Sequence, residues 1–146
     1  MTAVHITLGV ALVVVNLAAG VYGAWAWWRW HPAPGFWPLL RAGQLLVVVE
    51  AVLGLVLLLA GEELPPLHLI YGLTPLAVAF VAEQLRLIAA QTELDQRKLQ
   101  GRAAVAALPA EAQRELVRAI VRREVGVMAA SALVVALLGV RASGWL

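Results

Sequence analysis

Four long stretches of the chain are almost entirely apolar, and shorter polar segments separate them. Each has the length of about 20 residues that a helix needs to cross the hydrocarbon core of a bilayer. None shows the period-two alternation expected of a barrel strand. The pattern predicts an all-α integral membrane protein, a four-transmembrane-helix bundle that forms one domain over residues 1–146. The predicted spans are residues 3–28, 38–60, 67–90 and 120–140.

The composition agrees with a membrane location. Hydrophobic residues make up 62% of the 146 and charged residues only 14%, whereas about a quarter of a soluble domain is charged. A soluble protein of this size has too little interior to bury so much apolar surface. The first stretch follows no basic residue and is longer than the apolar part of a signal peptide, so we expect it to remain as a membrane helix.

The segment between the third and fourth stretches keeps a helical composition. Gly101 interrupts it, and Pro109 followed by Glu111 is typical of a helix start. We therefore expect the third and fourth helices to extend beyond the membrane as a cytoplasmic helical hairpin over residues 91–119.

Basic residues near the ends of the spans predict the orientation. The segment 29–41 contains two arginines and no acid, and the segment 86–123 contains eight basic residues against four acids. The second connection carries Glu62 and Glu63 and no basic residue. We therefore expect loops 29–41 and 86–123 to be cytoplasmic and both termini to face outward, in the plasma (inner) membrane. Five tryptophans between residues 25 and 37 fit the inner interface.

A carboxyl group stands near the middle of the second span, at Glu50. Helical periodicity places it on one face with Gly43 and Gly54. Small residues mark the face where another membrane helix approaches closely. The first span has Asn16 at a similar depth on its own glycine-rich face, and this predicts an Asn16–Glu50 hydrogen bond.

Such hydrogen bonds average about 0.6 kcal/mol in membranes, whereas inserting a carboxylate costs about 2.5–3.5 kcal/mol. The imbalance favours a functional Glu50 that carries protons, binds a cation or contacts a cofactor. Helical periodicity in the third and fourth spans turns further polar residues toward the interior. Together the four spans predict an internal polar seam that binds a ligand or protons, formed by Asn16, Glu50, Tyr71 and Ser131.

Two histidines, His5 and His68, are expected on inward faces near the outer surface. Two facing imidazoles can hold haem b or a divalent metal, and Glu62 or Glu63 could complete a His–His–carboxylate metal site. His31 follows the first span and is expected to be a loop residue.

Several function classes are excluded. The chain has no cysteine, no phosphate-binding glycine loop, no HExxH and no serine elbow motif, so we expect no enzyme. A net charge of +2 gives no sign of a nucleic-acid partner. The expected partner is the lipid bilayer. Two functions stay open. One is binding or transport of a proton or cation, a quinone or haem, with a transporter this small acting as a homo-oligomer. The other is an accessory subunit of a larger membrane complex, in which the polar residues join helices.

Overall fold

The computed structural model describes residues 2–62 and 65–144. Within these ranges all regular secondary structure is helical, with no strand, and helices make up 86% of the residues. The helices are α1 (Thr2–Arg29), α2 (Phe36–Leu59), α3 (Pro66–Gln96), α4 (Gly101–Ala106) and α5 (Ala110–Ala142).

Four helices in the described ranges, α1, α2, α3 and α5, are long and apolar enough to cross a membrane. The predicted spans 3–28, 67–90 and 120–140 lie inside α1, α3 and α5. The predicted span 38–60 agrees with α2 within two residues at each end. The prediction of an all-helical chain with four potential membrane helices is therefore confirmed. Pro75 stands inside α3, and Pro109 immediately precedes α5.

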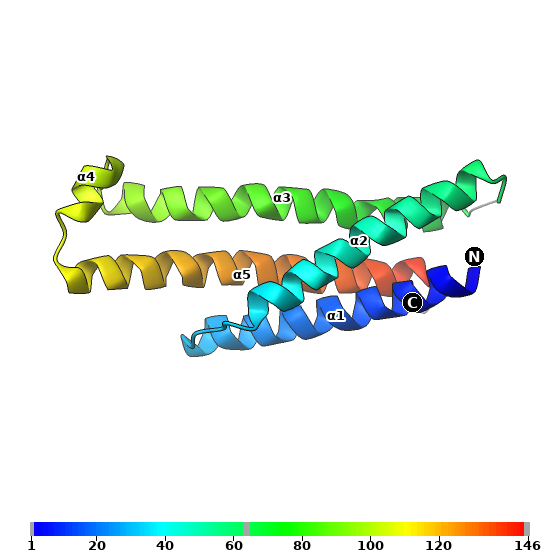
Figure 1. Cartoon of the computed structure of the whole chain (residues 1–146), viewed down its shortest axis with the longest axis horizontal. Coiled ribbons are helices and arrows are strands. Elements are labelled where there is room, and N and C mark those ends of the chain that lie inside the picture. The colour runs from blue at the N-terminus through cyan, green and yellow to red at the C-terminus, as the bar shows by residue number, and fades with distance from the viewer. Residues whose placement is uncertain (1, 63–64, 145–146) are drawn as a thin grey trace.

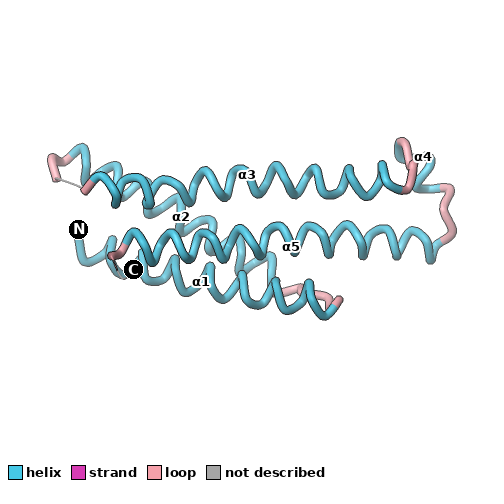
Figure 2. The backbone as a smooth tube through the Cα atoms, turned by 180° about the vertical axis from the view of Figure 1, so that it is seen from behind, coloured by secondary structure: helices cyan, strands magenta, loops and turns pink. Residues whose placement is uncertain are grey.

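The central element of the bundle is α5, which packs along both α1 and α3 (Figure 1). Helix α2 packs mainly on α1 and contacts α3 only lightly. Figure 2 shows α3 and α5 side by side along their lengths, with α4 in the connection at one end. The marked N- and C-terminal ends lie together at the opposite end (Figure 1).

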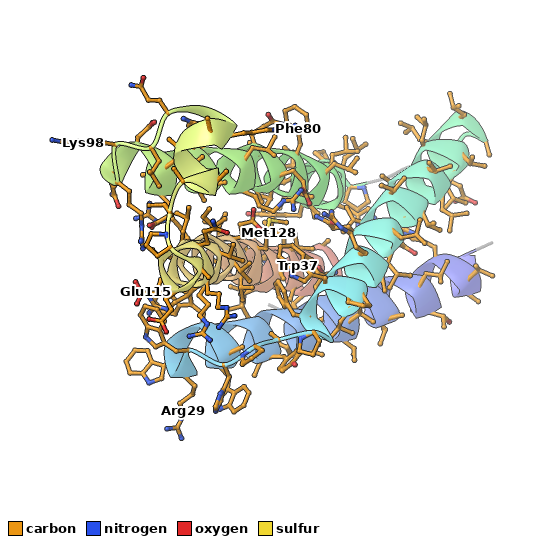
Figure 3. All side chains as sticks on the ribbon, turned by 60° about the vertical axis from the view of Figure 1, so that its left-hand side comes forward. Arg29, Trp37, Phe80, Lys98, Glu115 and Met128 are labelled. Carbon is orange, nitrogen blue, oxygen red and sulfur yellow. The ribbon has the colours of Figure 1, made fainter. Side chains whose placement is uncertain are left out.

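Small residues allow α1 to lie close to α5. A Cβ added at Gly20 would come within 2.6 Å of the Leu133 side chain. The core beside this contact contains Phe36, Leu40 and Met128, all almost fully buried. Figure 3 shows Met128 among the helices, whereas Arg29 and Lys98 extend outward. In lipid this packing, and not exclusion of water, holds the helices together.

Candidate functional site

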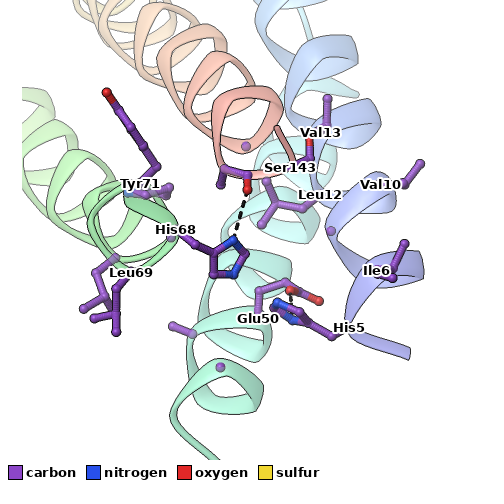
Figure 4. A pocket seen from close by; sticks show the side chains of 18 of the residues that line it. His5, Ile6, Val10, Leu12, Val13, Glu50, His68, Leu69, Tyr71 and Ser143 are labelled. Carbon is purple, nitrogen blue, oxygen red and sulfur yellow. Dashed lines mark hydrogen bonds and ion pairs between the residues drawn. The ribbon is translucent and has the colours of Figure 1, made fainter. Parts of the chain in front are cut away.

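Three polar side chains from three helices converge near the end of the bundle where the termini lie. His5 comes from α1, Glu50 from α2 and His68 from α3, and they point toward one another (Figure 4). The two imidazole rings have centroids 5.8 Å apart and are inclined by 73°. The structure thus brings together the histidine pair and the carboxyl group that the sequence had placed at different depths.

The His68 ring is held by the end of α5. Its Nδ1 lies 3.0 Å from the carbonyl oxygen of Ala142. A carbonyl can only accept a hydrogen bond, so Nδ1 carries the proton and donates it. In the neutral ring, Nε2 is then the unprotonated nitrogen with its lone pair available. A histidine that ligates a metal is commonly oriented in this way, by donating its other N–H to a backbone carbonyl or a carboxylate.

The His5 ring is held by Glu50. Its Nδ1 lies 2.5 Å from the carboxylate Oε2, and the two side chains are 20% and 11% exposed. The contact is close but is not aligned as a hydrogen bond. Nδ1 of His5 and Oε1 of Glu50 are buried without a hydrogen-bond partner among the described residues. Buried polar atoms of this kind are rare in native proteins and call for a physical explanation.

Gly9 on α1 faces the carboxylate, and a Cβ there would be in ordinary van der Waals contact, 3.9 Å from Oε2 of Glu50. The same stretch of α1 carries His5 one turn earlier, so the closest partner of the buried acid comes from α1. The contact between His5 and Glu50 takes the place of the Asn16–Glu50 hydrogen bond that the sequence predicted.

A cavity of about 480 Å³ surrounds these groups, within the usual range for small-molecule sites. All four long helices contribute to its wall. Apart from the polar cluster, the lining is mainly aliphatic or glycine, including Ile6, Val10, Leu55, Leu69, Gly54 and Gly72. At Gly54 and Gly72 an added Cβ would meet no atom within 4 Å. These glycines therefore widen the cavity and do not serve a close helix contact.

The predicted Asn16–Glu50 hydrogen bond is wrong. The Asn16 amide is 2% exposed and donates from Nδ2 to the carbonyl oxygen of Leu12, 2.9 Å away. It packs on Gly43 of α2, where a Cβ would lie 2.8 Å from Oδ1. The two antiparallel helices are thus shifted by about two turns from the expected register. Asn16 faces Gly43, and Glu50 faces Gly9 and His5.

The other predicted seam residues are dispersed. The Ser131 hydroxyl donates to the carbonyl oxygen of Met128 in its own helix, at 2.8 Å. Among the described residues, neither Ser131 nor Asn16 lines the cavity. Tyr71 does line it, but its side chain extends away from the histidines (Figure 4), and Arg141 lies 5.6 Å from its ring centroid.

Within the described ranges, no group of three or more His, Cys, Asp or Glu side chains is arranged to hold a metal ion. Glu62, one of the two carboxylates considered for a His–His–carboxylate site, is exposed. Glu63, the other, lies outside the described residues. His31 is an exposed residue after α1, and its ring centroid lies 5.5 Å from that of Trp25.

No family model, curated protein or solved structure matches this chain. The functional argument therefore rests on the site itself.

An ionic cluster joins α2 and α3 nearer the middle of the chain's long axis. Glu83 Oε1 accepts from Arg41 Nη1 at 2.5 Å and from Gln44 Nε2 at 2.9 Å. Its second oxygen accepts from Arg86 Nε at 3.0 Å. Glu83 and Arg86 are three residues apart and so share a helix face. The packing of α2 against α3 brings Arg41 and Gln44 to the same carboxylate.

Proposed function

We propose that this protein binds one b-type haem, which His5 and His68 would hold. The observation that carries the proposal is the pair of imidazoles 5.8 Å apart. Nδ1 of His68 is hydrogen-bonded to one acceptor, and Nδ1 of His5 lies close to another without hydrogen-bond alignment. Two metal–nitrogen bonds of about 2 Å each, with the distance from each ring centre to its nitrogen added, come near this centroid separation. One acceptor is a carboxylate and the other a backbone carbonyl, the two partners that most often orient metal-ligating histidines.

Haem suits the site better than a bare divalent ion. Protein-bound zinc takes three or four side-chain ligands, and the described residues contain no such group. A haem brings four nitrogens of its own, so two histidines complete its coordination. The aliphatic and glycine lining of the cavity offers apolar contacts to a flat macrocycle.

The proposal also explains why a carboxyl group is buried at Glu50. A carboxylate in an apolar site is costly without a compensating charge, and a ferric porphyrin core supplies a positive one. With both histidines holding it, the haem would supply redox chemistry. Electron transfer is the chemistry that such a site favours.

We place this site toward the outer side of the plasma membrane. The clustering of basic residues in segments 29–41 and 86–123 supports cytoplasmic loops there. In this orientation α3 and α5 continue beyond the inner interface as a cytoplasmic hairpin. The haem would lie near the opposite surface, within reach of an external redox partner.

The test is the absorption spectrum of protein purified from membranes of cells grown with adequate haem supply, before and after reduction. We expect a Soret band that shifts on reduction in the wild type, and its loss in His68→Ala and His5→Ala. His31→Ala is the matched control, because His31 is exposed and distant from the cavity, and it should keep the wild-type spectrum.

A colourless wild-type protein with helical circular dichroism would overturn the proposal. Co-purification of a larger membrane complex with that colourless protein would instead favour the accessory-subunit function.

A further inference from the structure

A second cavity of about 830 Å³ lies between α1 and α5, at the opposite end of α1 from His5. One end of this α1–α5 groove is polar and aromatic, lined by Trp27, Trp30, Glu93, Arg122 and Arg123. The other end is apolar and lined by Val127, Ala130 and Leu133. From Arg122 to Leu133 the helix rises about 16 Å toward the centre of the span.

The polar end is organised around the Arg122 guanidinium. This group lies 3.6 Å from the ring centroid of Trp30 and 5.0 Å from that of Trp27. Its Nε donates to the carbonyl oxygen of Trp27 at 3.1 Å, one of the last carbonyls of α1. The stacking and this hydrogen bond hold the plane of the guanidinium while its two terminal nitrogens make no hydrogen bond within the described residues.

Trp30 adopts an unusual backbone conformation to reach this position. Its φ is +57°, and the His31 N–H bonds the Ala26 carbonyl oxygen at 3.0 Å, which ends α1 in a left-handed turn. Lys98 after α3 has the same conformation, with a φ of +56°, whereas the equivalent positions after α2 and α5 are Gly61 and Gly144, which adopt it without a Cβ penalty. A side chain there costs about 1–2 kcal/mol.

We propose that the α1–α5 groove binds an anionic phospholipid. The phosphate accepts hydrogen bonds from the terminal nitrogens of Arg122, and an acyl chain follows the apolar end toward Leu133. Arginine is well suited to phosphate because its planar fork donates two parallel hydrogen bonds. Basic pockets between membrane helices bind anionic headgroups in this way. Arg123 contributes less, because it is already paired with Glu93 at 3.4 Å.

The first test compares two substitutions that remove the same charge. Purified full-length protein is placed in phosphatidylcholine nanodiscs with increasing phosphatidylglycerol, and retained lipid is counted by native mass spectrometry. Arg122→Gln should weaken phosphatidylglycerol retention by about tenfold, the scale of losing a charge-assisted hydrogen bond. Arg118→Gln, an exposed arginine one turn earlier on α5, should change retention less than twofold.

The second test separates binding from folding. Trp30→Gly places a residue that tolerates the left-handed turn at that position, so resistance to unfolding should stay equal or rise. Phosphatidylglycerol retention should nevertheless fall, because the guanidinium loses the ring on which it stacks. A merely structural role for Trp30 would predict no change in retention.

Equal losses in Arg122→Gln and Arg118→Gln would show diffuse attraction to the membrane surface and overturn the proposal. Unchanged retention in Trp30→Gly would do the same. Inorganic phosphate that competes with the lipid at equal concentration would show that the acyl chain adds nothing, and would overturn the assignment to a lipid. Neither arginine variant should alter the Soret band, so the two proposals can fail independently.

Discussion

The contact between Asn16 and Gly43 allows the register of α1 against α2 to be tested by substitution. In Gly43→Ala the new methyl group would lie 2.8 Å from Oδ1 and 2.9 Å from Nδ2 of the Asn16 amide. That amide is 2% exposed and is tied to the Leu12 carbonyl oxygen. It cannot move aside without breaking its hydrogen bond or separating the helices.

The expected magnitude follows from two opposing effects. Overpacking of a tight contact costs about 1–3 kcal/mol, whereas replacing glycine by alanine inside a helix gains about 0.5–1 kcal/mol. Gly43→Ala should therefore lower the free energy of unfolding by roughly 1–2 kcal/mol. Gly54→Ala, on the same helix, adds a methyl group with no atom within 4 Å. It should be neutral or stabilising.

The assay is reversible unfolding in mixed micelles with increasing denaturing detergent, followed by circular dichroism. A double-mutant cycle identifies the cause. Asn16→Ala removes the side chain that the new methyl group meets, so Gly43→Ala should cost little in that background. The coupling should fall within about 0.5–3 kcal/mol, the range for residues in direct contact.

Equal stability of Gly43→Ala and Gly54→Ala would refute the observed register. So would strong coupling of Asn16→Ala to Glu50→Gln and none to Gly43→Ala, because that result would restore the register expected from the sequence.

Three further outcomes are expected. Gly72→Leu should fill the cavity from a position where a Cβ meets no atom within 4 Å, so the Soret absorbance per protein should drop while stability holds, and undiminished absorbance would contradict the proposed site. Glu50→Gln removes the carboxylate that faces His5. The variant should retain haem about 10–100-fold more weakly, measured by haem transfer to an apoprotein acceptor. Unaltered haem retention would mean that Glu50 does not support the His5 ligand. Glu83→Ala leaves Arg41 and Arg86 without their shared acceptor and should lower the free energy of unfolding by about 2 kcal/mol, with the haem spectrum unchanged; a change below the error of the unfolding assay would show that the cluster contributes nothing.

The sequence by itself determined the helices. Lipid offers no partner for backbone N–H and C=O groups, so each long apolar stretch had to become a helix. The breaks follow from equally local chemistry. Pro109 directly precedes α5, and Gly101, with a φ of +78°, lies in the connection after α3. The histidine pair could also be proposed from the sequence, because helical periodicity turned His5 and His68 toward the interior.

Only the tertiary structure decided which polar groups meet. Glycine-rich faces on α1 and α2 can slide past each other by two turns, about 10 Å, without changing the hydrophobic pattern. Side-chain fit selected one register, in which Asn16 fills the space over Gly43 and Glu50 reaches His5. The acceptor for His68 is the backbone carbonyl of Ala142 at the end of α5. No residue type marks such a carbonyl in a sequence, because every residue carries one and only the packing of α5 against α3 brings this one to the ring.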